Sequence, residues 1–117
     1  MRRTILLSVL ILVGCSYYQS HLRTTCPGGK APIVCIDSSL KATPDPVHVQ
    51  RGEWLHFFLA NREEQLEIRS NVLENQGNDK GQAWGRVKKD AKLGRHKYTI
   101  FNRTTQKSND PEVMIDP

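Results

Sequence analysis

The sequence has few of the residues and motifs on which common enzyme mechanisms depend. It contains only three cysteines, and none lies beyond Cys35. No serine lies in a Gly-x-Ser-x-Gly turn, and no two carboxylates form a recognisable general acid/base pair. Since neither a nucleophile nor an acid/base pair can be identified, we expect a protein that is not an enzyme and that has no catalytic residues and no cofactor.

Long hydrophobic runs are also missing. The one apolar stretch, Ile5–Val13, is shorter than the roughly 20 residues that a membrane-spanning helix needs. It follows Arg2 and Arg3 and ends in Gly14 and Cys15, so that a charged region, an apolar region and a small residue succeed one another as in a targeting segment. Two alternatives for this stretch are an ordinary secretion signal that is cleaved at another position and a buried strand.

The end of this segment, Leu12-Val13-Gly14-Cys15, resembles the lipobox of bacterial lipoproteins. The resemblance implies cleavage before Cys15 and a diacylglyceryl group on its sulfur. Each buried CH₂ of an acyl chain contributes about 0.8 kcal/mol, so several chains would hold the protein durably to a membrane. Because Ser16 rather than Asp follows the lipidated position, the resemblance also implies an outer-membrane address facing the periplasm.

This interpretation divides the chain into three parts. Residues 1–14 would be a lipoprotein signal peptide, residues 15–25 a lipidated cysteine with a flexible tether, and residues 26–117 a single folded domain. The tether is polar and has no hydrophobic periodicity, as expected of a linker.

With Cys15 carrying lipid, Cys26 and Cys35 remain as an even pair. In an oxidising periplasm such a pair is most simply a disulfide. A redox pair usually has the C-x-x-C spacing, and a metal site would need more ligands than His21 nearby. We therefore expect a structural disulfide that closes the loop CPGGKAPIVC.

Alternation of apolar and polar residues predicts strands in most of the remaining chain. We expect residues 74–82 to form a loop and residues 90–94 to be the only stretch that could form a helical turn. Short strands, polar loops and the lack of a long helix predict a small antiparallel Greek-key β-sandwich, cupredoxin-like or Ig-like. The expected strands cover residues 31–36, 47–50, 54–59, 65–69 with a possible extension over 71–73, 83–89, 96–102 and 112–116.

The pattern V-x-V-x-x-G-x-x-L-x-F at residues 47–57 resembles the opening of cupredoxin-like domains, and residues 91–94 leading to Tyr98 resemble a later part of that family. The copper site of that family needs two His, a Cys and commonly a Met. The corresponding positions here, near Leu66 and at Ile100, offer neither His nor Cys. The resemblance therefore implies the architecture without the metal site, and a metal-binding cupredoxin relative is left as an alternative.

Two stretches are candidates for binding a partner. In the first, Trp54, His56 and Phe58 share one face of a strand whose other face is also apolar. Exposed aromatic side chains commonly anchor interfaces with proteins or glycans. The alternative, which we favour from the sequence, is a central strand whose outer side is covered by a loop or a neighbouring segment.

The second candidate is the basic stretch of residues 80–103, represented by Lys88, Lys89 and Arg95, in which Asp90 is the only acidic residue. It could attract lipopolysaccharide phosphates, lipid head groups or an acidic protein. The favoured alternative is a solvated strand edge whose lysines prevent edge-to-edge pairing. Nucleic acid is not expected as a partner, because no aromatic stacking platform is interleaved with these charges.

These expectations define a function hypothesis: a non-enzymatic cell-envelope lipoprotein that is held to a membrane by its lipid anchor and binds an unidentified protein or envelope component. Either the aromatic face or the basic stretch would make the contact. A second hypothesis is a periplasmic inhibitor or immunity factor that blocks an exported hydrolase, as small disulfide-bearing lipoproteins often do.

Overall fold

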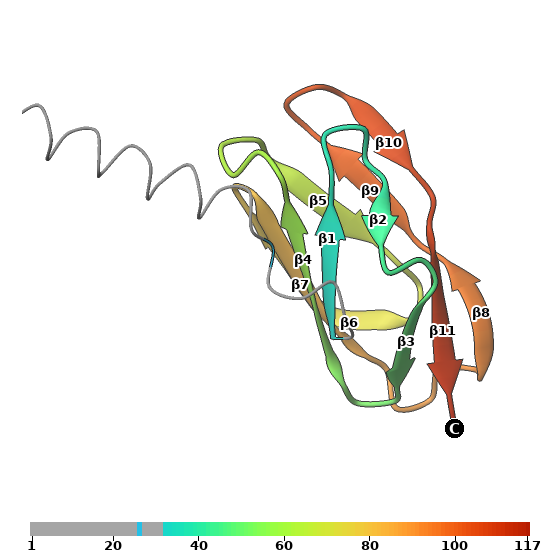
Figure 1. Ribbon diagram of the computed structural model, residues 1–117. Coiled ribbons are helices and arrows are strands. Elements are labelled where there is room, and N and C mark those ends of the chain that lie inside the picture. The colour runs from blue at the N-terminus through green and yellow to red at the C-terminus, as the bar shows by residue number, and fades with distance from the viewer. Residues whose placement is uncertain (1–25, 27–31) are drawn as a thin grey trace, which may run out of the picture.

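The computed structural model describes Cys26 and residues 32–117, which form strands and turns and contain no helix (Figure 1). The predicted all-β class is therefore confirmed. The strands, in chain order, are β1 (Ile33–Ile36), β2 (Ala42–Thr43), β3 (Val47–Gln50), β4 (Trp54–Leu59), β5 (Leu66–Arg69), β6 (Leu73–Asp79), β7 (Gln82–Val87), β8 (Gly94–Lys97), β9 (Thr99–Asn102), β10 (Lys107–Asn109) and β11 (Glu112–Asp116).

One layer of the sandwich is a five-stranded sheet in the order β2-β1-β4-β7-β6, with β4 in the middle. Most neighbours in it are antiparallel, but β1 and β4 are parallel. The predicted antiparallel sandwich therefore has two parallel exceptions, this pair and β3 with β11. Parallel neighbours need a long crossover, and β2 and β3 lie between β1 and β4 in the chain.

The other layer consists of two three-stranded sheets, β10-β9-β5 and β3-β11-β8. Only Tyr98 separates β8 from β9, so the two sheets follow one another along the same side of the sandwich (Figure 1). The predicted strand over residues 96–102 is thus present but interrupted at Tyr98.

Apolar side chains from both layers meet between the sheets. Phe57 from β4 is fully buried and packs against Tyr98, with ring centroids 5.4 Å apart and planes at 54°. Each buried Val, Leu, Ile or Phe contributes about 1.5–3 kcal/mol before conformational entropy is counted. The largest fully buried side chains are Phe57, Ile36, Leu40, Leu55, Leu59, Leu66, Ile100, Ile115, Val34, Val47, Val49 and Val87.

The expected loop over residues 74–82 is wrong, because residues 73–79 form the edge strand β6. Its polar side chains are mostly exposed, and the strand is held by backbone pairing with β7 rather than by burial. A register shift between Glu74 and Gly77 interrupts this pairing. Irregular, polar edge strands of this kind resist pairing with other chains, and they also hide the alternation by which strands are recognised in a sequence.

Two smaller expectations are also corrected, and one further strand was not expected. Residues 71–73 do not extend β5, because the chain turns at Asn71 and Val72, where the Val72 amide donates to Ser70 Oγ at 3.2 Å. Residues 90–94 form no helical turn; the chain turns at Lys89 and Asp90 and then enters β8. The polar stretch after β9 contains the short strand β10.

Tyr98 supplies a test of the core. Its hydroxyl is buried and has no hydrogen-bond partner among the described residues, and an unsatisfied buried polar group costs about 1–3 kcal/mol. Burial, reinforced by the Asp45 carboxylate, raises the pKa of Tyr98 above its ordinary value of 10.0.

We expect Tyr98→Phe to increase the free energy of unfolding by about 1 kcal/mol at neutral pH. Above pH 10 the unfolded wild type loses this proton while the folded protein keeps it, so wild-type stability should fall with rising pH, and Tyr98→Phe should fall less steeply. Urea denaturation at neutral and alkaline pH measures both effects. A less stable variant with an unchanged pH dependence would contradict this account of the hydroxyl.

Candidate functional site

Strand β4 carries the predicted aromatic residues on its outer side. Buried and outward-facing residues alternate along the strand, and Leu55, Phe57 and Leu59 are the ones that enter the core. Trp54 on the opposite side is 42% exposed, and it is one of two large hydrophobic side chains exposed in the described part of the chain. The favoured expectation that this face is covered is therefore wrong at Trp54.

Strand pairing brings further apolar residues to the same face. His56 lies opposite Ile33 of β1 on one side and opposite Trp84 of β7 on the other. Residues directly opposite one another in a sheet project from the same face. We define the outer aromatic face as the set of side chains that this register collects, namely Ile33, Trp54, His56, Phe58 and Trp84.

Trp84 lies flat on this face. Its partner on β6 is Gly77, and a Cβ at residue 77 would overlap three indole atoms simultaneously, Nε1, Cε2 and Cζ2. Similar contacts with three neighbouring ring atoms mean that the face of the indole, rather than its edge, covers the glycine. Trp84 remains half-buried, and so it contributes a flat apolar surface beside His56.

Two arginines border the outer aromatic face. Arg62 places its guanidinium 4.8 Å from the centre of the Phe58 ring, within the range of a cation–π contact. Arg86 lies opposite Trp54, and its Nε donates to the Gly52 carbonyl at 3.1 Å. The aromatic surface thus has a cation at each end of β4.

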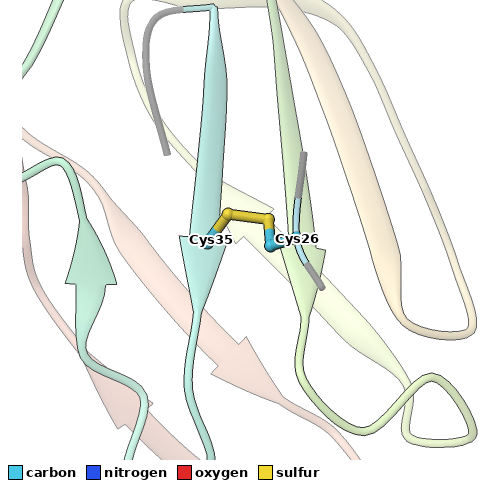
Figure 2. Close-up of a disulfide and its surroundings, with 2 residues drawn as sticks. All are labelled: Cys26 and Cys35. Carbon is cyan, nitrogen blue, oxygen red and sulfur yellow. A yellow bond between two sulfur atoms is a disulfide. The ribbon is translucent and has the colours of Figure 1, made fainter. Parts of the chain in front are cut away.

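The predicted disulfide between Cys26 and Cys35 is confirmed, and it lies at the Phe58 end of this face (Figure 2). The two Cα atoms are 6.0 Å apart, within the normal range for a disulfide. Cys35 is directly opposite Phe58. The disulfide therefore fixes residue 26 beside the outer aromatic face.

A cleft of about 450 Å³ opens beside the disulfide, and the side chains of Phe58 and Arg62 contribute to its lining. Asp37 also lines it. The Ser39 hydroxyl donates to this carboxylate at 2.7 Å and the Lys41 amide at 2.9 Å, and these bonds lower the pKa of Asp37. The Asp37 carboxylate is thus engaged within its own turn.

The predicted basic residues do not form one surface with the aromatic ones. Lys88 directly follows β7, and Lys89 lies in the next turn. Arg95 belongs to β8 in the other layer, where its Nη1 is 3.8 Å from Glu112 Oε1. The six predicted partner-binding residues are therefore divided between two layers, and only Trp54, His56 and Phe58 share a face.

The histidines and acidic residues of the described part of the chain are dispersed over the fold. Within residues 32–117 and Cys26, no group of three or more His, Cys, Asp or Glu side chains is placed to hold a metal ion. His48 Nδ1 pairs with Asp116 Oδ2 at 3.0 Å, and His96 Nε2 contacts the Lys92 carbonyl oxygen at 2.7 Å. These two imidazoles are thus engaged by groups of neighbouring strands and turns.

The part of the chain that the structure describes contains no helix long and apolar enough to cross a membrane. The predicted lipidation site, Cys15, lies outside the described residues. A scan against protein-family models found no match, and a search of curated proteins found no significant relative.

Sequence reasoning missed Trp84 and Gly77 as parts of this surface. The missed signal is the alternation of Ala83, Gly85 and Val87, which are all buried and which leave Trp84 on the outer side.

The packing of Trp84 on Gly77 predicts the effect of a single methyl group. Gly77→Ala should displace the indole and lower the free energy of unfolding by about 1–3 kcal/mol, because the added Cβ would overlap three atoms of the ring. In a Trp54→Phe background, the fluorescence of the remaining described tryptophan should shift to longer wavelength. Asn78→Ala, an exposed change on the same strand, is the matched control. Equal stability of the two variants would refute the packing described here.

Proposed function

We propose that this protein is a lipid-anchored cell-envelope protein that binds another protein through its outer aromatic face. The observation that carries the proposal is the 42% exposure of Trp54 on the central strand of the five-stranded sheet. Contiguous apolar patches on the surface of a soluble protein often mark interaction sites. Trp54 is continuous through the strand register with His56 and the flat indole of Trp84.

The composition of this face suits a protein partner. Tryptophan and arginine are the residues that most often dominate binding energies at interfaces, and here Arg62 and Arg86 border the aromatic side chains. The scaffold is also rigid, since β4 is paired with a strand on each edge. Little conformational freedom would be lost on binding, which favours affinity.

The envelope address is supported by the lipobox-like sequence at Cys15 and by the disulfide between Cys26 and Cys35. Disulfides persist in secreted and periplasmic proteins and are rare in reducing compartments. In this proposal the acyl chains hold the N-terminus in a membrane, and the domain presents its outer aromatic face to a partner in the periplasm.

The address is tested by metabolic labelling with palmitate. We expect the wild-type protein to incorporate label and to fractionate with membranes, because the thioether at Cys15 carries the acyl chains. Cys15→Ser should incorporate none. Ser16→Ala, which leaves the sulfur in place, serves as the control. Equal labelling of Cys15→Ser and wild type would remove the anchor from the proposal.

The binding face is tested by photo-crosslinking in intact envelopes. A benzophenone amino acid at His56, which is exposed in the middle of the outer aromatic face, should yield a discrete adduct with another protein. The same group at Thr105, an exposed residue of the β9–β10 turn in the other layer, is the matched control.

Trp54→Ala should weaken the adduct formed from position 56, since a buried interface tryptophan typically contributes 2 kcal/mol or more, about a thirtyfold change in affinity. Mass spectrometry of the adduct identifies the partner. An exported hydrolase would place the protein among inhibitors or immunity factors. Identical adducts from positions 56 and 105, or none from position 56, would contradict the assignment of the binding face.

A further inference from the structure

A second surface lies at the end of the sandwich where β4 begins. The turn between β3 and β4 is bonded to the end of β7: the Gly52 amide donates to the Val87 carbonyl and the Val87 amide to the Glu53 carbonyl, each at 2.8 Å. Arg51 Nε donates to the Ala91 carbonyl at 2.7 Å. These bonds hold the connection between β7 and β8, residues 88–93, against the rest of the fold. We call this connection the lysine loop.

The lysine loop combines positive charge with an exposed apolar side chain. It contains Lys88, Lys89 and Lys92 against one acidic residue, Asp90. Leu93 at its end is 48% exposed, and it is the other large hydrophobic side chain exposed in the described part of the chain. Trp54, which begins β4, lies at the same end of the sandwich.

Nearby carboxylates offset this charge only in part. Glu53 Oε1 accepts the Gln50 amide at 2.8 Å, and this carboxylate is a counter-charge next to the loop, whereas Asp116 is paired with His48. Asp90 is the remaining acidic group of the loop, and Arg51 adds a further cation beside it. The loop therefore presents an excess of positive charge around an exposed leucine.

We propose that the lysine loop docks on a bilayer that contains anionic lipids, with the three lysines at the head groups and Leu93 in the apolar boundary. Charge alone would suit any polyanion. An exposed leucine gains nothing from a soluble polyanion, whereas at a bilayer its side chain leaves water, worth about 1.5–3 kcal/mol when complete. Lysines near an anionic surface each add about 1 kcal/mol, which is about a fivefold change in the docking equilibrium.

The tether allows this contact to form on the membrane that holds the anchor, and to this extent the inference rests on the proposed address. Ten residues lie between Cys15 and Cys26, which makes eleven steps from one Cα atom to the next. A fully extended chain of that length spans about 36–40 Å. Trp54 and Phe58 at the two ends of β4 are only about 13 Å apart at the usual rise per residue, so a tether that starts beside Phe58 can reach past the lysine loop.

The cysteine content of the chain allows a direct test. With Cys15 lipidated and Cys26 bonded to Cys35, an added cysteine is the only free thiol. The lipidated full chain carrying Leu93→Cys is labelled with an environment-sensitive fluorophore and reconstituted into vesicles of phosphatidylcholine, with or without about one third phosphatidylglycerol. Lys107→Cys, on the exposed strand β10, carries the control label. Flotation of the vesicles reports the anchor, and fluorescence reports the loop.

We expect the label at position 93 to brighten and shift to shorter wavelength in vesicles with phosphatidylglycerol, and to lose this change at high salt. The label at position 107 should not respond. Replacing Lys88, Lys89 and Lys92 by Gln should weaken docking about a hundredfold, at about fivefold per charge. Replacing Lys80, Arg103 and Lys107 by Gln, which removes as many charges elsewhere, should leave the response of the Leu93→Cys label unchanged.

The results separate the two proposals. Flotation on both vesicle types without a response at position 93 would overturn lipid docking and leave the anchor in place. A fluorescence response at position 93 that appears only with phosphatidylglycerol supports docking. This holds even if the protein does not float with pure phosphatidylcholine, a result that would remove the anchor from the proposed function. Equal responses at positions 93 and 107, or tight binding of heparin by the loop without any response to vesicles, would overturn docking on lipid.

Discussion

The structure depends on the placement of β4 between β1 and β7. Pairing on both edges fixes the strand, so that its odd-numbered residues Leu55, Phe57 and Leu59 must enter the core and its even-numbered residues must face outward. Phe57 connects the layers through its contact with Tyr98. A slip of one residue in register would place the whole apolar set in solvent. The burial of Phe57 therefore turns Trp54 to the outer side of the sheet, and the core and the outer aromatic face are two consequences of one pairing.

The same pairing places a different group of contacts at each end of β4. At the Phe58 end lie the disulfide, the cleft and the contact between Phe58 and Arg62. At the Trp54 end lie Arg86 and the bonds that fix the lysine loop. In the account proposed here the tether leaves from the first end, the outer side of β4 from Trp54 to Phe58 faces a protein partner, and the lysine loop beyond Trp54 lies against lipid head groups. Such a protein would be oriented at a membrane by two contacts, an acyl anchor and a charged loop.

Much of the fold could be predicted from the sequence, because period-two alternation is strong where one face is buried. This holds for Trp54–Leu59 and for Glu112–Asp116, whose predicted bounds agree with β4 and β11. It fails for β6, whose polar residues are held by backbone bonds and leave no hydrophobic pattern. The site was only partly predictable for a related reason. Alternation assigns a residue to a face, but it cannot pair strands, so neither the contact of Trp84 with Gly77 nor the position of Arg95 in the other layer could be read from the chain.

The central claim is that β4 buries one side and leaves the other open to a partner. Hydroxyl-radical footprinting of the purified protein and of intact envelopes measures both sides of that claim residue by residue. The account predicts rapid oxidation of Trp54 and little oxidation of Phe57 in the purified monomer, with Trp54 becoming protected in envelopes. Slow oxidation of Trp54 in the purified monomer, or equal oxidation of Trp54 in both preparations, would contradict it.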